Sequence, residues 1–304
     1  MLTSVQPENT KPCSRPAQPY YLGLPLWSNS AWLGSLYPAG SNSQNYLQHY
    51  STVFNTVEGN TTFYALPSVA TVDSWLRQAQ PGFKFCFKLP KTITHSGRLK
   101  GGRLQHGAEL SAFFTRLQPL AEHLGPFMIQ LPAEAGAHTV EDIVAFIAGL
   151  PQDFQFSIEL RSLDFFRKDD LEKRLNQCLI KHQVDRVCFD SRALFSQPAS
   201  TEAEKEAQRK KPNLPVHAIA TANNPIIRFI GTKNSDYNQQ YYQTWLPKIA
   251  QWCAEGKTPY FFVHTPANQV APLHAQTLHD QLSHLSGWQP LAKTVQSKNQ
   301  LAMF

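Results

Sequence analysis

Short apolar segments of this chain alternate with polar residues in a two-residue period, which is the side-chain period of a β-strand. In residues 154–161 the apolar side chains fall on one face of the expected strand, and Glu159 and Arg161 fall on the other. A parallel strand that is covered on both sides should be apolar on both faces. Buried charge is costly unless it is paired, so this pattern indicates either a structural ion pair or a functional site.

Eight such segments predict eight strands, and apolar residues at helical spacing predict helices between them. Strands that alternate with helices form parallel sheets, and eight repeats predict a single (β/α)8 barrel of the TIM type. The expected strands are residues 20–27, 56–64, 83–90, 126–132, 154–161, 185–192, 225–232 and 259–265. The expected helices are residues 44–54, 68–78, 108–123, 139–150, 168–182, 239–255 and 271–286.

The predicted barrel occupies residues 20–290 and is flanked by two terminal segments. Residues 1–19 are polar and rich in proline, which predicts a disordered or extended segment, and residues 291–304 form a tail. Residues 196–215 are charged and predict an inserted loop with a short solvated helix, which serves either as a spacer or as a lid. An open doubly wound sheet is the alternative fold, but it would normally have a glycine-rich turn after its first strand, unlike residues 24–27.

The composition favours a basic protein of a reducing compartment. The 304 residues carry a formal net charge of +6, which favours contact with anions. The five cysteines are odd in number and form no C-x-x-C pair, as is usual in reduced compartments. Neither a signal-peptide core nor an apolar run long enough to span a membrane occurs in the sequence. We therefore expect a cytoplasmic protein without membrane contact.

Five phrases of the sequence resemble one family when their order and spacing are taken together. They read VEGNTTFY at residues 57–64, FCFKLP with ITH at 85–95, LGPFMIQLP at 124–132, IELR at 158–161 and RFIG at 228–231. Over residues 20–285 the chain resembles the domain-of-unknown-function family 72, a set of eight-stranded barrels without an established activity. This resemblance implies the barrel fold but no chemistry.

Two positions depart from the pattern of that family. The resemblance implies Arg-Phe-His-Gly in the seventh strand, where this chain has Ile230 as the third residue. It also implies asparagines after the eighth strand, where this chain has His264 followed by residues 265–268. A histidine is thus lost at one position and another is present nearby, so any role of the lost histidine is in doubt in this chain.

The carboxyl ends of barrel strands normally carry the active site. This rule gathers ten polar residues into one candidate site, in which three carboxylates face three cations. A neutralised ion-pair network that only fills the barrel is the alternative. The ten residues are Glu58, Asn60, Lys88, His95, Gln130, Glu159, Arg161, Asp190, Arg228 and His264.

The residue types of this site favour an anionic small molecule that carries a phosphate or a carboxylate. Lys88 and Arg228 are expected to hold the anion, because a guanidinium offers a planar fork and an ammonium a compact charge. Glu159 and His95 are expected to exchange protons in a hydrolase or isomerase reaction. The remaining members are expected to contact the substrate. These are Arg161, Glu58, Asn60, Gln130, Asp190 and His264.

Three alternatives remain open at this point. No cofactor is expected, although a divalent metal could use the carboxylates and the two histidines, against the repulsion of the nearby cations. A nucleic-acid-binding or nuclease-like barrel could use the basic residues at 98–103 and 209–211 as a phosphate track. A non-catalytic binding or scaffold protein is the third alternative.

Overall fold

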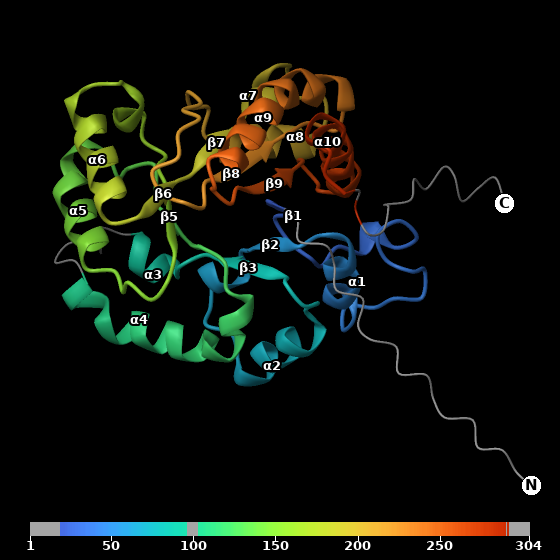
Figure 1. Cartoon of the computed structure of the whole chain (residues 1–304), viewed down its shortest axis with the longest axis horizontal. Coiled ribbons are helices and arrows are strands. Elements are labelled where there is room, and N and C mark those ends of the chain that lie inside the picture. The colour runs from blue at the N-terminus through green and yellow to red at the C-terminus, as the bar shows by residue number, and fades with distance from the viewer. Residues whose placement is uncertain (1–18, 96–102, 290, 292–304) are drawn as a thin grey trace, which may run out of the picture.

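Parallel strands with helices packed around them form the architecture of the chain (Figure 1). The computed structural model describes residues 19–95, 103–289 and 291. The strands are β1 (Tyr21–Leu24), β2 (Thr56–Gly59), β3 (Lys84–Phe87), β4 (Phe127–Gln130), β5 (Phe156–Glu159), β6 (Val184–Arg186), β7 (Cys188–Asp190), β8 (Ile226–Ile230) and β9 (Tyr260–His264).

Helices connect successive strands, as the apolar spacing predicts. The α-helices are α1 (Tyr46–Val53), α2 (Val69–Gln78), α3 (Lys91–Thr94), α4 (Arg103–Leu117), α5 (Val140–Ala148), α6 (Asp170–Lys181), α7 (Arg192–Phe195), α8 (Glu202–Lys210), α9 (Ser235–Ala254) and α10 (Ala271–Ser286). The 3-10 helices are η1 (Ser30–Trp32), η2 (Thr61–Phe63), η3 (Gln118–His123), η4 (Ala137–Thr139) and η5 (Leu163–Phe166). Within the described residues, no helix combines the length and apolar character needed to cross a membrane.

The strands form two parallel sheets, one with the order β3-β2-β1-β9-β8-β7 and one with the order β4-β5-β6. The predicted α/β fold with parallel sheets is confirmed. The expected sixth strand is divided into β6 and β7, because the backbone N–H of Val187 turns to the carbonyl of Ile158 on β5, at 2.9 Å. At the edge where β3 faces β4, the backbone N–H of Gly125 donates to the carbonyl of Phe85 at 2.9 Å. The backbone N–H of Leu89 donates to the carbonyl of Met128 at 3.0 Å. Hydrogen bonds therefore link the two sheets where β3 meets β4.

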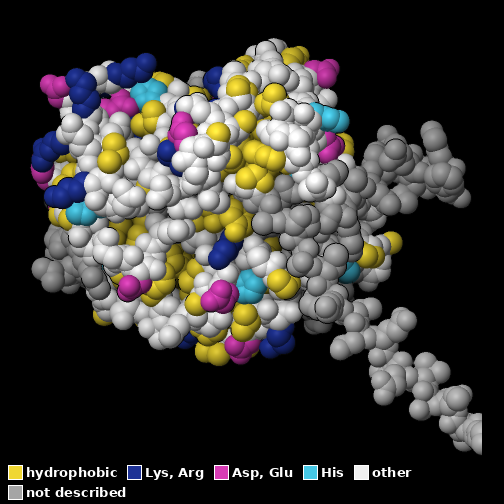
Figure 2. Space-filling view, viewed as in Figure 1, with side chains coloured by type: hydrophobic (Ala, Val, Ile, Leu, Met, Phe, Trp, Pro, Cys, Tyr) yellow, Lys and Arg dark blue, Asp and Glu magenta, His cyan; other side chains and the backbone are white. Residues whose placement is uncertain are grey.

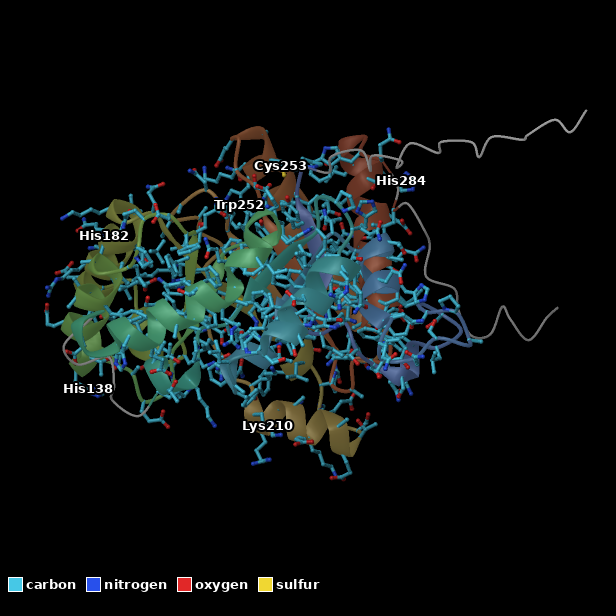
Figure 3. The ribbon with its side chains drawn as sticks, turned by 90° about the horizontal axis from the view of Figure 1, so that it is seen from below. His138, His182, Lys210, Trp252, Cys253 and His284 are labelled. Atoms are coloured by element: carbon cyan, nitrogen blue, oxygen red, sulfur yellow. The ribbon has the colours of Figure 1, made fainter. Side chains whose placement is uncertain are left out.

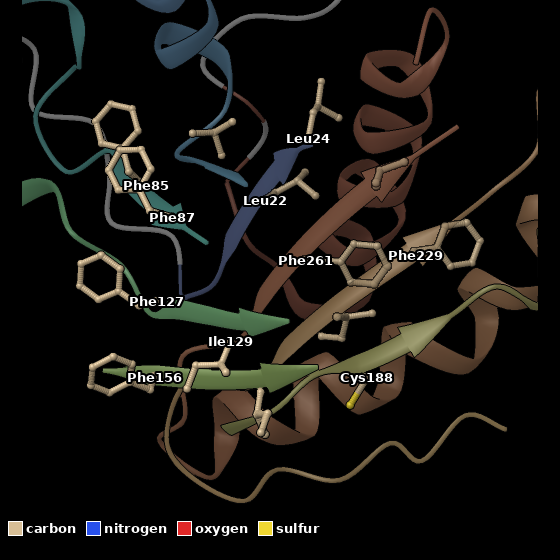
Figure 4. Close-up of a cluster of buried hydrophobic side chains, with 14 of the residues drawn as sticks. Leu22, Leu24, Phe85, Phe87, Phe127, Ile129, Phe156, Cys188, Phe229 and Phe261 are labelled. Carbon is tan, nitrogen blue, oxygen red and sulfur yellow. The ribbon is translucent and has the colours of Figure 1, made fainter. Parts of the chain in front are cut away.

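Alternating strand residues face the helices, and they are largely aromatic. The rings of Phe85 and Phe87 stack with centroids 5.1 Å apart, and Phe127 and Phe156 lie on the neighbouring strands β4 and β5 (Figure 4). The intervening residues form a second buried group at the amino-terminal halves of the strands. It consists of Cys86, Met128, Val187, Ile226, Tyr260 and Phe262. Toward the carboxyl ends, the side chains on this second face become polar.

One predicted strand is shorter in the structure, and one predicted insertion can be compared with it. The expected strand 56–64 ends at Gly59, because Thr62 donates its hydroxyl to the carbonyls of Gly59 and Lys88 and the chain turns into η2. In the expected insertion 196–215, the predicted short solvated helix is α8, which has no buried residue. Nearly all of the expected terminal segments 1–19 and 291–304 lies outside the described residues, as does most of the basic stretch 98–103.

We predict that a methyl group at Gly23 destabilises the fold. A Cβ there would lie 2.1 Å from the backbone oxygen of Thr56 on the paired strand, whereas a Cβ at Gly40 would meet nothing within 4 Å. Gly23→Ala should lower the free energy of unfolding by about 1–3 kcal/mol, as overpacking does. Gly40→Ala, the matched control, should leave it unchanged or raise it by a few tenths of a kcal/mol, up to about 1. Urea denaturation measures both, and equal effects would refute this account of β1.

Candidate functional site

Arg228 on β8 lies at the centre of the polar layer. Its Nε and Nη2 donate to the two carboxylate oxygens of Glu58 on β2, each at 2.8 Å, and Nη1 donates to Glu159 on β5. The residue is 1% exposed, and the ring of Phe189 lies 5.4 Å from the guanidinium carbon. A buried bidentate pair of this kind fixes geometry as well as charge. Arg228 therefore ties three strands together.

The carboxylates of Glu58 and Glu159 also accept from other residues. Lys88 lies 3.2 Å and His264 2.9 Å from Glu58, and the Nε of Arg161 donates to Glu159 at 2.7 Å. Burial alone would raise the pKa of both carboxyl groups, but the neighbouring cations, led by Arg228, outweigh it and hold both pKa values well below the usual range. Both groups are therefore ionised near neutral pH.

Lys88, which directly follows β3, is also part of this polar layer. Its Nζ donates to the side-chain oxygen of Gln130 at 2.8 Å and lies beside Glu58. Burial, followed by repulsion from Arg228, lowers the pKa of Lys88 to about 8, although Glu58 and Glu159 oppose the shift. An ammonium has three N–H donors. Within the described part of the chain, Gln130 and Glu58 face two of them and the third has no acceptor, although the ring centroid of Phe63 lies 6.0 Å from Nζ.

His264 at the end of β9 is a neutral imidazole near pH 7. Burial lowers its pKa to about 4, even though Glu58 favours the charged form. Because an ionised carboxylate can only accept, the Nε2 of His264 carries the proton and donates to Glu58 at 2.9 Å. The bond from Nε2 fixes the tautomer of the ring, and Nδ1 is then an unprotonated acceptor.

We call the seven residues that this network joins the carboxyl-end cluster. Each was predicted from the sequence, and the structure brings them together at the carboxyl ends of β2, β3, β4, β5, β8 and β9. The cluster consists of Glu58, Lys88, Gln130, Glu159, Arg161, Arg228 and His264.

Two further predicted residues lie beside the cluster without bonding to it. His95 shares a hydrogen bond of 2.9 Å with Thr94, and burial followed by repulsion from Arg161 lowers its pKa, against a weaker opposing effect of Glu134. Asn60 donates to the carbonyl of Pro25 at 2.8 Å. Glu159 and His95 were both predicted as proton-transfer groups, but a carboxylate whose pKa is strongly lowered is a weak base, which argues against Glu159 in that role.

The placement of Asp190 in the site is wrong. Its carboxylate accepts from the indole N–H of Trp245 on α9 at 2.8 Å and from Arg192, so it points toward the helices. Phe189, the preceding residue on β7, occupies the inner face against Arg228. The sequence of this strand would allow either face to turn toward the interior. The buried indole N–H of Trp245 on α9 determines that Asp190 turns outward.

Lys211, which follows α8, is a cation near the cluster that sequence reasoning missed as a site residue. It is partly buried and interacts electrostatically with Arg228, Glu58, Lys88 and Glu159. Burial, followed by repulsion from Arg228, lowers its pKa to about 7. In the sequence it is one member of a basic run of three, and that run gives no sign of which member turns inward.

The charges of this region are unbalanced. Four cations, Lys88, Arg161, Lys211 and Arg228, are grouped with two carboxylates that both bind Arg228. Beyond its Nε, Arg161 has no acceptor among the described residues, and its side chain is 18% exposed. Those residues also contain no group of three His, Cys, Asp or Glu side chains that could hold a metal ion. The arrangement suits a negatively charged ligand.

The model of the family described as "Protein of unknown function DUF72" matches residues 21–299. The chain belongs to the DUF72 family. The UPF0759 protein YecE of Escherichia coli (strain K12) is 41% identical over 276 residues, which cover 90% of this chain and 93% of YecE. The UPF0759 protein YunF of Bacillus subtilis is 32% identical over 74 residues, about a quarter of each chain.

Solved DUF72 structures share the fold. The DUF72 family protein TM1631 from Thermotoga maritima has a TM-score of 0.65 at 21% identity and covers 87% of this chain and 99% of its own. The Enterococcus faecalis protein EF0366 has a TM-score of 0.64 at 17% identity and covers 92% of this chain and 98% of its own. In the present DUF72 protein, Ile230 is 2% exposed and packs with Phe189 and Leu194, so an apolar contact occupies the position where the resemblance implied histidine.

We predict that Glu58→Gln destabilises this DUF72 protein by about 3–5 kcal/mol. The substitution keeps the shape of the side chain but removes the charge that neutralises the buried Arg228 and Lys88. Glu141→Gln is the matched control, because Glu141 forms a bidentate pair with Arg174 on the surface. That exposed pair should cost no more than about 1 kcal/mol. Chemical denaturation of both variants is the measurement, and similar losses would contradict the role given to Glu58.

Proposed function

We propose that this protein binds a small anion at the carboxyl-end cluster, with Lys88 and Arg161 as the residues that contact the ligand. The observation that carries the proposal is the surplus of cations over carboxylates in a largely buried region. Each cation has lost part of its hydration, and a bound anion would replace it. Arg228 is a positioning residue in this proposal, because its donors are occupied by Glu58 and Glu159.

We also infer that the two sheets form one closed barrel. Hydrogen bonds link β3 to β4, and β6 and β7 continue one another across Val187, which would make eight strands in a ring. A closed ring of parallel strands directs all the carboxyl ends to one side. The barrel would thereby hold the cluster residues in a fixed arrangement around one opening.

For proton transfer, His264 is a better candidate than Glu159. Its imidazole is neutral, its proton is held on Nε2 by Glu58, and Nδ1 remains as an acceptor. Glu159 serves instead as a counter-ion between Arg228 and Arg161. Hydrolysis and isomerisation both use such a group, and they remain the reaction classes that fold analogy favours.

A small anion fits the charges better than a nucleic-acid track does. In the basic run 209–211, Lys210 pairs with Glu206 on the outer face of α8, whereas Lys211 interacts with the cluster. On the face shown in Figure 2, basic and acidic side chains are interspersed. Phosphate tracks instead need cations in a row.

We predict that the protein binds sulfate and that Lys88→Met weakens this binding about tenfold or more. Methionine keeps much of the length of lysine but removes one charge-assisted hydrogen bond to the ligand. Isothermal titration calorimetry with sodium sulfate at constant ionic strength measures the affinity. Lys173→Met changes the net charge equally, but Lys173 lies on the exposed face of α6 and pairs with Asp170, so this variant should bind as the wild type does.

The proposal fails if the wild type does not bind sulfate, or if the Lys88 and Lys173 variants lose affinity to the same extent. Thermal unfolding of each variant, followed by circular dichroism, shows whether the fold persists. A loss of affinity in a folded Lys88→Met protein, with an unchanged control, supports a specific site.

We further predict that sulfate binding takes up protons. An anion next to Lys88 favours its ammonium form and raises its pKa above about 8. Affinity should therefore fall as the pH rises through that value, by up to about tenfold per pH unit. Titrations in two buffers with different ionisation enthalpies measure the proton uptake, and an affinity independent of pH from about 6 to about 9 would contradict the mechanism.

A further inference from the structure

We propose that the insertion 196–215, which carries α8, supplies Lys211 as a third ligand-binding cation, and that the ligand is a dianionic oxyanion of the phosphate-monoester class. This inference rests on the proposed function and extends it to a residue outside the strands.

The carboxyl-terminal part of the insertion is held by specific hydrogen bonds to the segment that precedes it and to the start of the insertion itself. The hydroxyl of Ser191 donates to the carbonyl of Pro212 at 2.8 Å, and Gln208 donates to the carbonyls of Leu194 and Gln197 at 2.9 and 3.0 Å. Ala207 packs against the apolar group of Phe189, Leu194 and Ile230. These contacts position the end of α8 beside Phe189, whose other neighbour is Arg228.

The two lysines at the end of α8 point in different directions. Lys210 is exposed, pairs with Glu206 and extends away from the body of the molecule (Figure 3). Lys211 lies just beyond the helix, with its backbone N–H bonded to Ala207 at 2.9 Å, and its side chain is partly buried. The capping box of Thr201 and Glu204 fixes the other end of α8, so the helix is held at both termini.

Lys211 has charged neighbours but no direct partner among the residues that the structure describes. It interacts electrostatically with Arg228, Glu58, Lys88, Glu159 and His264. No hydrogen bond or ion pair of its ammonium occurs within residues 19–95, 103–289 and 291. A partly buried ammonium with no acceptor is costly unless it releases its proton or gains an anion. Burial, followed by repulsion from Arg228, lowers its pKa to about 7.

The charge of the completed site indicates the charge of the ligand. With His264 neutral and both lysines protonated, the cations Lys88, Arg161, Lys211 and Arg228 exceed the carboxylates Glu58 and Glu159 by two charges. A dianion neutralises this surplus, whereas a monoanion leaves one cation uncompensated. Phosphate monoesters carry between one and a half and two negative charges near neutral pH and offer three strong acceptor oxygens, which matches the three cations that retain free donors.

The experiment compares Lys211→Met with Lys210→Met, two neighbouring variants that remove the same charge. Sulfate is the first probe, because it stays dianionic from about pH 6 to about pH 9, so that any pH dependence belongs to the protein. Nitrate is the monoanionic control. Lys211→Met should lower sulfate affinity by about 10- to 100-fold and change nitrate affinity much less, and Lys210→Met should bind both anions as the wild type does.

The pH dependence provides a second measurement. In the wild type, part of the proton uptake on sulfate binding should occur near pH 7, and Lys211→Met should remove that part while keeping the part near pH 8 from Lys88. If Lys211 only supported the fold, Lys211→Met would lower thermal stability without changing this pH profile. Lys211→Arg should restore sulfate affinity but not the proton uptake near pH 7.

The outcomes separate this inference from the proposed function. If Lys88→Met loses sulfate affinity and Lys211→Met does not, the anion site stands and the role of Lys211 is refuted. If neither loses affinity, both proposals fail. Inorganic phosphate and glycerol phosphate then distinguish a free oxyanion from an ester, because tighter binding of the ester indicates contacts beyond the oxyanion. Equal or tighter binding of nitrate than of sulfate would refute a dianionic ligand.

Discussion

The guanidinium of Arg228, held between Glu58 and Glu159, is the interaction on which the rest of the site depends. A buried guanidinium must have its charge neutralised and its donors occupied, because the cost of an unpaired ion in the interior is several kcal/mol. Here two carboxylates from β2 and β5 meet that requirement across the interior. The three strands are consequently held in a fixed relation, and the polar layer at their carboxyl ends follows from it.

This arrangement determines which groups are left for chemistry. The carboxylates remain ionised because Arg228 and the surrounding cations stabilise their charged forms, so they serve as counter-ions and orient their neighbours. Glu58 fixes the tautomer of His264. Glu159 accepts from the Nε of Arg161, whose terminal nitrogens have no acceptor among the described residues. Within the described residues, Lys88, Arg161 and Lys211 then retain donors without an acceptor, and burial followed by repulsion from Arg228 lowers the pKa of the two lysines. The site thereby stores unfavourable electrostatic energy that an anion would relieve.

Much of the site could be predicted from the sequence, because the two-residue period of a strand places alternating residues on one face. Glu58, Lys88, Glu159, Arg228 and His264 all follow this rule. Asp190 does not, since its preferred partner is the indole of Trp245, 55 residues later in the chain, and no local pattern reveals that contact. The orientation of Lys211 likewise depends on bonds such as that from Ser191 to Pro212, which a charged run without apolar anchors does not disclose. The division of the sixth strand at Val187 has the same origin in a contact between strands.

A crystal structure of the protein with sodium selenate would test the central claim most directly, because selenium locates the anion by its anomalous scattering. The account predicts one strong peak within hydrogen-bond distance of Lys88 and of the terminal nitrogens of Arg161, with the ammonium of Lys211 as the third contact. It also predicts that Arg228 stays bound to Glu58 and Glu159. A peak elsewhere, or an anion on Arg228 with either carboxylate displaced, would contradict it.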